Sequence, residues 1–125
     1  MRYTLFLHWP ELTSEQLGEE MMEAGKEAFH AYAKALDDAG VLVSAEVLQP
    51  STASTTLTLA NGSLQVQDGP YADTKEKIGG TFVIDVPDKD AALAWAEKCP
   101  AAQWGTIEIR PSATRVVDGV WVTAK

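Results

Sequence analysis

The sequence has few basic residues and almost no cysteine. It contains ten Lys and Arg residues against 18 Asp and Glu residues, which gives a formal net charge of -8. Because an acidic surface repels phosphate backbones, this shortage of basic residues argues against a nucleic-acid partner. Cys99 is the single cysteine, so an internal disulfide and a multi-cysteine metal site are excluded.

Long apolar runs are missing as well. No uninterrupted apolar segment approaches the roughly 20 residues that cross a bilayer, and the start, MRYTLFLHWPEL, lacks the apolar core and cleavage site of a signal peptide. No phosphate-binding Gly-x-x-x-x-Gly-Lys-Ser/Thr run occurs. With 46% hydrophobic and 22% charged residues, the 125-residue chain instead predicts one soluble domain over residues 1–125, in the cytoplasm and without a membrane partner.

Hydrophobic periodicity predicts strands and two helices. Alternating apolar and polar residues predict strands over 2–9, 41–49, 55–59, 63–67, 79–86 and 105–110. Apolar residues at three- and four-residue steps predict a long amphipathic helix over 14–39 and a shorter helix over 88–98. Thr13 and Gln16 have the spacing of a capping box at the start of the long helix, and Gly40 is typical of the position after its end.

Two dipeptides are typical of tight hairpin turns. Asn61-Gly62 separates two of the predicted strands, and Asp118-Gly119 predicts a small hairpin in the tail. The core order is therefore β-α-β, a hairpin, then β-α-β. This order predicts a ferredoxin-like α+β sandwich, in which two helices cover one face of an antiparallel sheet.

The second face of that sheet has no helix to cover it. Strand alternation places apolar and charged side chains on it together, namely Phe6, His8, Leu42, Glu46, Leu48, Val83, Asp85, Glu108 and Arg110. A mixed face of this size is typical of an interface or a lined cavity. Because most soluble oligomers are symmetric pairs, we expect a homodimer packed sheet to sheet.

The segment 68–80, DGPYADTKEKIGG, resembles the signature of the DGPF family, a branch of the YCII-related domain proteins. Tyr71 stands where that signature usually has Phe. Further segments agree with the family in the same order, namely 39–42, 46–50, 84–88 and 107–111. The resemblance covers residues 2–111 and implies a dimeric α+β barrel.

The resemblance also has implications for activity. In the wider superfamily, clefts between sheet and helices or between subunits host small enzymes that isomerise, oxygenate or dehalogenate aromatic-type substrates. Members of the DGPF branch are often described as associated with alternative sigma factors. YCII-like relatives are credited with a His-Asp pair, for which the resemblance implies His30, while Cys99-Pro100 stands where those relatives commonly have Asp-Pro.

Three side chains are candidates for acid-base chemistry. Glu46 is a lone carboxylate between apolar strand residues, and a carboxyl near an apolar wall can serve as an acid or a base. His8 lies on the same mixed face, and an imidazole exchanges protons near neutral pH. His30 lies among charged residues of the long helix, where a solvated histidine is the alternative interpretation. The spacing of the two histidines does not predict a metal site, and no cofactor is expected.

A polar loop supplies the candidate binding residues. Asp68, Gly69 and Pro70 form a turn, and the residues after them can close over a pocket. The candidate ligand-binding residues are Asp68, Gly69, Pro70, Tyr71, Lys75, Glu76, Glu108 and Arg110. The leading hypothesis is a homodimer that binds a small molecule in a cleft and performs acid-base chemistry on it. The alternative is a non-enzymatic interaction or regulatory protein, for example an accessory linked to an alternative sigma factor.

Overall fold

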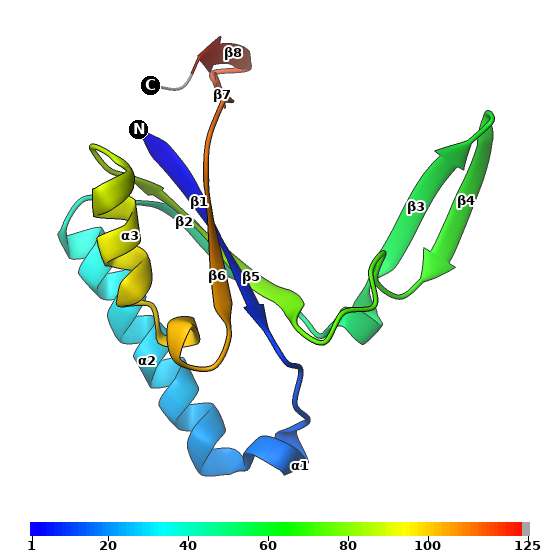
Figure 1. Ribbon diagram of the computed structural model, residues 1–125, viewed down its shortest axis with the longest axis horizontal. Helices are drawn as coiled ribbons and strands as arrows, with labels where there is room; N and C mark the ends of the chain where they lie inside the picture. Colours follow the sequence, from blue (N-terminus) through cyan, green and yellow to red (C-terminus); the bar gives the residue numbers. More distant parts are fainter. Residues whose placement is uncertain (124–125) are drawn as a thin grey trace.

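The computed structural model describes residues 1–123, and its largest sheet is antiparallel with the strand order β2-β5-β1-β6 (Figure 1). The strands of this sheet are β1 (Arg2–Trp9), β2 (Leu42–Val47), β5 (Lys77–Asp85) and β6 (Thr106–Pro111). The α-helices are α1 (Ser14–Leu17), α2 (Glu19–Asp38) and α3 (Lys89–Glu97). The architecture is α+β and is consistent with the predicted ferredoxin-like fold.

Smaller elements lie outside this sheet. Two hairpins form sheets of their own, β3 (Thr55–Ala60) with β4 (Ser63–Asp68) and β7 (Thr114–Val117) with β8 (Val120–Thr123). Two short 3-10 helices, Ser51–Ala53 and Pro100–Gln103, connect neighbouring elements. The last two residues of the domain predicted over 1–125 lie outside the described residues.

The hydrophobic core lies between the sheet and the helices α2 and α3 (Figure 1). Alternate residues of β1 and β5 face the helices, as the sequence pattern predicted. The buried core side chains are Tyr3, Leu5, Leu7, Tyr32, Leu36, Phe82, Ile84, Val86, Ala92, Ala96, Cys99 and Ala101.

Burial of the Cys99 side chain raises the pKa of its thiol above the ordinary value.

The capping box is confirmed, but the long helix is interrupted. The Thr13 side chain accepts from the Gln16 backbone N–H, and the Gln16 side chain accepts from the Thr13 N–H. The prediction of one helix over 14–39 was wrong, because Gly18 adopts φ +80° and ψ 158° and separates α1 from α2. A residue in that conformation cannot continue an α-helix, and only glycine adopts it without strain.

A register shift in β2 reverses one predicted side-chain direction. Leu42 pairs with Ile84, whereas Ser44 pairs with Val83, so one residue of β2 is inserted between the two pairs. Such a bulge changes the alternation of the strand. Leu42 therefore packs against the core, and its predicted place on the helix-free face was wrong.

Both predicted hairpin turns are confirmed. Asn61 and Gly62 have φ values of 51° and 77°, and Asp118 and Gly119 have φ values of 50° and 78°. Two successive positive φ values match the turn that joins twisted antiparallel strands most directly. None of the helices in residues 1–123 is long and apolar enough to cross a membrane.

Tyr32 connects α2 to α3, and its burial leads us to expect a loss of stability at alkaline pH. Its hydroxyl donates to the Trp95 carbonyl at 2.8 Å, and burial raises the pKa of Tyr32 well above its ordinary value of 10.0. In the unfolded chain the phenol ionises near pH 10, but in the folded chain it stays protonated. The stability that Tyr32 contributes is therefore complete below about pH 10 and is lost as the pH rises further.

We expect Tyr32→Phe to remove this alkaline dependence. Above pH 10, the free energy of unfolding of the wild type should fall by up to about 1.4 kcal/mol per pH unit more steeply than that of the variant. At neutral pH, loss of the hydrogen bond should cost about 1 kcal/mol. Urea unfolding at stepped pH measures both effects, and Tyr71→Phe is the matched control because that side chain is 87% exposed. The expectation would be contradicted if, above pH 10, the free energy of unfolding fell equally steeply with pH in the wild type and in Tyr32→Phe.

Candidate functional site

The side of the β2-β5-β1-β6 sheet that faces away from α2 and α3 is here called the open face. Cross-strand pairing arranges its side chains in rows. In one row, Glu46 pairs with Thr81, Thr81 with Phe6, and Phe6 with Glu108. The neighbouring row, toward the end of β1, contains Ile78, His8 and Thr106.

Three polar side chains of adjoining rows contact one another. The Nε2 atom of His8 lies 3.7 Å from Oε1 of Glu108, which is an ion-pair distance but too long for a hydrogen bond. The second oxygen of Glu108 accepts from the Arg110 guanidinium. That guanidinium also lies 5.8 Å from the centre of the Phe6 ring, within the range of a cation-π contact. A half-buried imidazole is thereby placed beside a carboxylate that a cation already fixes.

His8 also lines a cleft of about 990 Å³ at this end of the sheet. One wall is the segment from Leu48 to Thr56, and the opposite wall is the loop from Pro70 to Ile78. Charged and polar side chains from the loop and the sheet lie in the lining, namely His8, Tyr71, Thr74, Lys75, Glu76, Lys77 and Thr106. Leu48, Pro50, Pro70 and Ile78 supply apolar surface to the same lining. Apolar walls with a few polar groups are typical of small-molecule sites.

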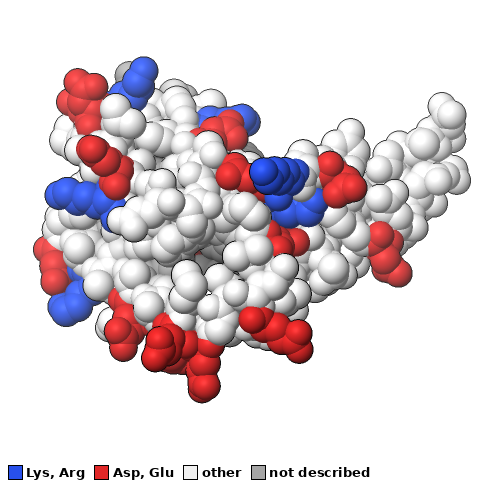
Figure 2. Space-filling view, turned by 60° about the horizontal axis from the view of Figure 1, so that its bottom comes forward, with Lys and Arg blue, Asp and Glu red and all other residues white. Residues whose placement is uncertain are grey.

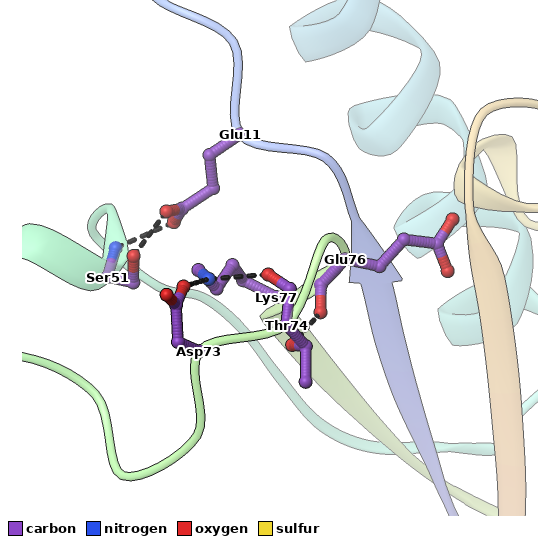
Figure 3. Close-up of polar contacts among 6 residues, drawn as sticks. All are labelled: Glu11, Ser51, Asp73, Thr74, Glu76 and Lys77. Atoms are coloured by element: carbon purple, nitrogen blue, oxygen red, sulfur yellow. Dashed lines mark hydrogen bonds and ion pairs between the residues drawn. The ribbon is translucent and has the colours of Figure 1, made fainter.

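Hydrogen bonds within the loop hold its shape (Figure 3). The Lys77 ammonium donates to the Asp73 carboxylate at 3.0 Å and to the Thr74 carbonyl. The Thr74 hydroxyl donates to the Glu76 carbonyl. The side chain of Glu76 extends toward β6, where it accepts from the Thr106 hydroxyl at 2.9 Å. Because Thr106 pairs with His8 across the strands, this bond attaches the loop to the row that contains the imidazole.

A second contact holds the opposite wall of the cleft. The Glu11 carboxylate accepts from the Ser51 backbone N–H at 2.6 Å and also from the Ser51 hydroxyl (Figure 3). Two donors on one carboxylate fix the short 3-10 helix Ser51–Ala53 to the chain that follows β1. Both walls of the cleft are thus attached near the same, C-terminal end of β1, which carries His8.

The residues predicted from the DGPY segment lie at two adjacent hollows. Pro70, Tyr71, Lys75 and Glu76 line the larger cleft. Asp68 and Gly69 line a smaller hollow of about 410 Å³, which shares Ser51, Pro70 and Lys77 with the larger one. The predicted loop and His8 are therefore brought together.

Four predicted side chains line neither hollow. Glu46 is exposed and lies three strand spacings from Glu108 in its row, which is about 14 Å. Arg110 contacts Glu108, and neither of these two side chains lines the cleft. His30 is exposed on α2, so the sheet lies between it and His8. Among the described residues 1–123, no three His, Cys, Asp or Glu side chains are grouped closely enough to hold a metal ion.

The opposite end of the open face carries a different ion pair. The amino group of Met1 donates to the Asp85 carboxylate at 3.0 Å and to the Val86 carbonyl at 2.8 Å. This hydrogen bond from the N-terminus lowers the pKa of the Asp85 carboxyl. Asp85 pairs with Arg2 at the far end of β1 from His8, so it takes no part in the cleft.

Sequence reasoning did not find the wall formed by residues 48–56. Ser51 and its partner Glu11 are 40 positions apart, and neither belongs to a motif. Thr106 was also missed, because its importance depends on the register that places it beside His8. The Ser- and Thr-rich composition that follows Pro50 was the available signal, and it indicates a loop rather than a binding wall.

Comparison with known proteins gives two matches. The model of a family described as the YCII-related domain matches residues 1–113, which include every element that forms the cleft. An uncharacterized protein of Rhizobium meliloti (strain 1021) is 32% identical over 115 residues, and the match covers 90% of this chain and 93% of that protein.

Proposed function

The chain belongs to the YCII-related domain family, and from the geometry of its cleft we propose that it binds a small molecule there and transfers a proton to or from it through His8. The single observation that carries this proposal is the position of His8, in the lining of a cleft of about 990 Å³ and 3.7 Å from Glu108. Within the family, we assign the chain to the DGPF branch on its segment 68–80.

The chemistry follows from the side chains around the imidazole. A histidine next to a carboxylate is the arrangement in which the carboxylate orients the ring and the ring exchanges the proton. Here Glu108 is the carboxylate beside the ring, at ion-pair distance, and Arg110 fixes Glu108 from the other side. Lys75 and Tyr71 lie in the same lining and supply a cation and an aromatic ring that can hold the ligand.

We further propose that the protein acts as a homodimer of the dimeric α+β barrel type. The open face supports this, because α2 and α3 cover only the other side of the sheet (Figure 1). Phe6 and Val83 on the open face are only half-buried in the single chain. A second copy placed sheet to sheet would remove both side chains from water.

A thermal-shift screen of metabolites tests the cleft. A compound present at a hundredfold excess over its Kd should stabilise the wild type by about 2.7 kcal/mol. Proton transfer is then measured by NMR in D2O, as exchange of a ligand proton for deuterium. His8→Gln should slow that exchange by about a hundredfold or more, because general acid-base groups contribute at least that much.

His30→Gln is the matched control for this experiment. It makes the same chemical change on α2, on the other side of the sheet, and should leave both binding and exchange as in the wild type. A screen in which no compound shifts the melting temperature would overturn the proposal. That outcome would favour the alternative, a regulatory protein that docks through its acidic surface, whose carboxylates are prominent along one side of the molecule (Figure 2).

A further inference from the structure

The β3–β4 hairpin, residues 55–68, is here called the arm, and one of its faces is apolar. The cross-strand pairs Leu57–Val66 and Leu59–Leu64 place four aliphatic side chains on that face. Each of these side chains is between 58% and 67% exposed. The other face carries Thr and Gln side chains, namely Thr56, Thr58, Gln65 and Gln67.

Nothing in the described part of the chain covers the apolar face of the arm. Strands β3 and β4 pair with each other and with no other described strand. The arm projects away from the sheet and the helices (Figure 1), and its outer part is free of charged side chains (Figure 2). A two-stranded hairpin is at best marginally stable in water, so a partner is needed to cover this face.

Charge restricts the nature of that partner. Residues 55–67 contain no charged side chain, whereas the whole chain has a net charge of -8. A lipid surface is a poor match, because faces that bind membranes are usually flanked by Lys and Arg. A neutral arm can dock on a second copy of this acidic chain without placing carboxylates against carboxylates.

The area of the open face favours the same partner. Four strands about 4.8 Å apart and about 20 Å long present roughly 400 Å², only half of the roughly 800 Å² that each partner of a stable complex usually buries. The arm has two strands of that length, so its apolar face measures about 200 Å². In a reciprocal exchange, each chain buries this face of its own arm and about 200 Å² of the surface on which its partner's arm docks. Sheet contact and arm exchange together thus reach the usual size.

We propose that the apolar face of the arm docks on a second copy of the chain, and that two arms exchanged about a twofold axis hold the dimer together. This inference rests on the homodimer of the proposed function and names the surface that maintains it. A reciprocal exchange buries both apolar faces in one association step, as an isologous interface requires.

Sedimentation equilibrium of the full chain tests the arm. Leu59→Lys places a charge on the apolar face and should raise the Kd of the dimer by about tenfold or more. Thr58→Lys adds the same charge to the polar face of the same strand and should change the Kd by less than about threefold. Leu59→Thr preserves strand propensity and should give an intermediate increase, which separates loss of docking from unfolding of the hairpin.

The possible results separate this inference from the proposed function. If Leu59→Lys and Thr58→Lys leave the same strong dimer, the arm does not hold it and the inference fails, while the sheet-to-sheet dimer stands. Equal weakening by both variants also overturns the inference, because docking through one face requires a difference between them. A wild type that stays monomeric at high micromolar concentration overturns the arm and the dimer together, whereas the thermal-shift screen still decides the cleft.

Discussion

Replacing Gly105 with alanine is expected to lower the free energy of unfolding by about 3 to 5 kcal/mol, in the range of the most damaging single substitutions. A Cβ atom at this position would overlap the carbonyl oxygen of His8 and would lie 3.0 Å from its carbonyl carbon. Both are backbone atoms of a central strand, so neither can rotate away. Strand β6 would have to separate from the end of β1, where Thr106 pairs with His8.

Urea unfolding of Gly105→Ala and Gly25→Ala measures this effect against a matched control. Gly25 lies inside α2, and a Cβ atom there would meet no atom within 4 Å. Because alanine is the better helix former, Gly25→Ala should raise the free energy of unfolding by about 0.5 to 1 kcal/mol. The same substitution is thus expected to lower the free energy of unfolding at Gly105 and to raise it at Gly25. Similar changes at both would show that Gly105 is not required for close approach to His8.

Leu36→Ala should produce the second large loss, about 3 kcal/mol within the usual range of 2 to 5. Leu36 is completely buried and belongs to the cluster that packs α2 against the sheet. The change removes its contacts and leaves a cavity between two rigid layers, which cannot fully collapse. Helix propensity does not contribute to the loss, since alanine is at least as good a helix former as leucine.

Leu93→Ala tests whether the expected loss of stability depends on burial of the leucine or on the Leu-to-Ala change alone. Leu93 also lies in a helix, α3, but its side chain is 55% exposed. We therefore expect its substitution to change the free energy of unfolding by less than about 1 kcal/mol. Calorimetry of the two variants under one condition is sufficient, and a Leu36→Ala loss no larger than that of Leu93→Ala would contradict the packing account.

The main elements of the fold were predictable because local signals agree with the global pattern. Alternation in 2–9 and 79–86 identified the two central strands and the side chains that face the helices. The capping pair Thr13 and Gln16 marked a helix start that the structure confirms. Where one residue changes the geometry, prediction failed. Gly18 interrupts an amphipathic pattern that continues on both sides of it, and periodicity does not detect such a break.

The candidate site was less predictable than the fold. The loop at 68–76 was found because its turn residues and its family signature are local. The partner of His8 is Glu108, one hundred positions along the chain, and only the register of β1 with β6 brings them together. Glu46 is predicted on the same face of the sheet as His8 and Glu108. Alternation, however, assigns a side chain to a face and not to a position along the strand. A pattern with a period of two cannot say which row a side chain occupies.

Burial of Cys99 has a practical consequence for experiments on this molecule. Its side chain is 1% exposed, and the raised pKa keeps the thiol protonated at neutral pH. Because thiolates and not thiols react with maleimides and similar reagents, we expect the natural protein to react with them only very slowly. A cysteine introduced at the exposed Ser63, next to the turn of the β3–β4 hairpin, would therefore carry a fluorophore or spin label at one chosen point, with no need to remove the native thiol.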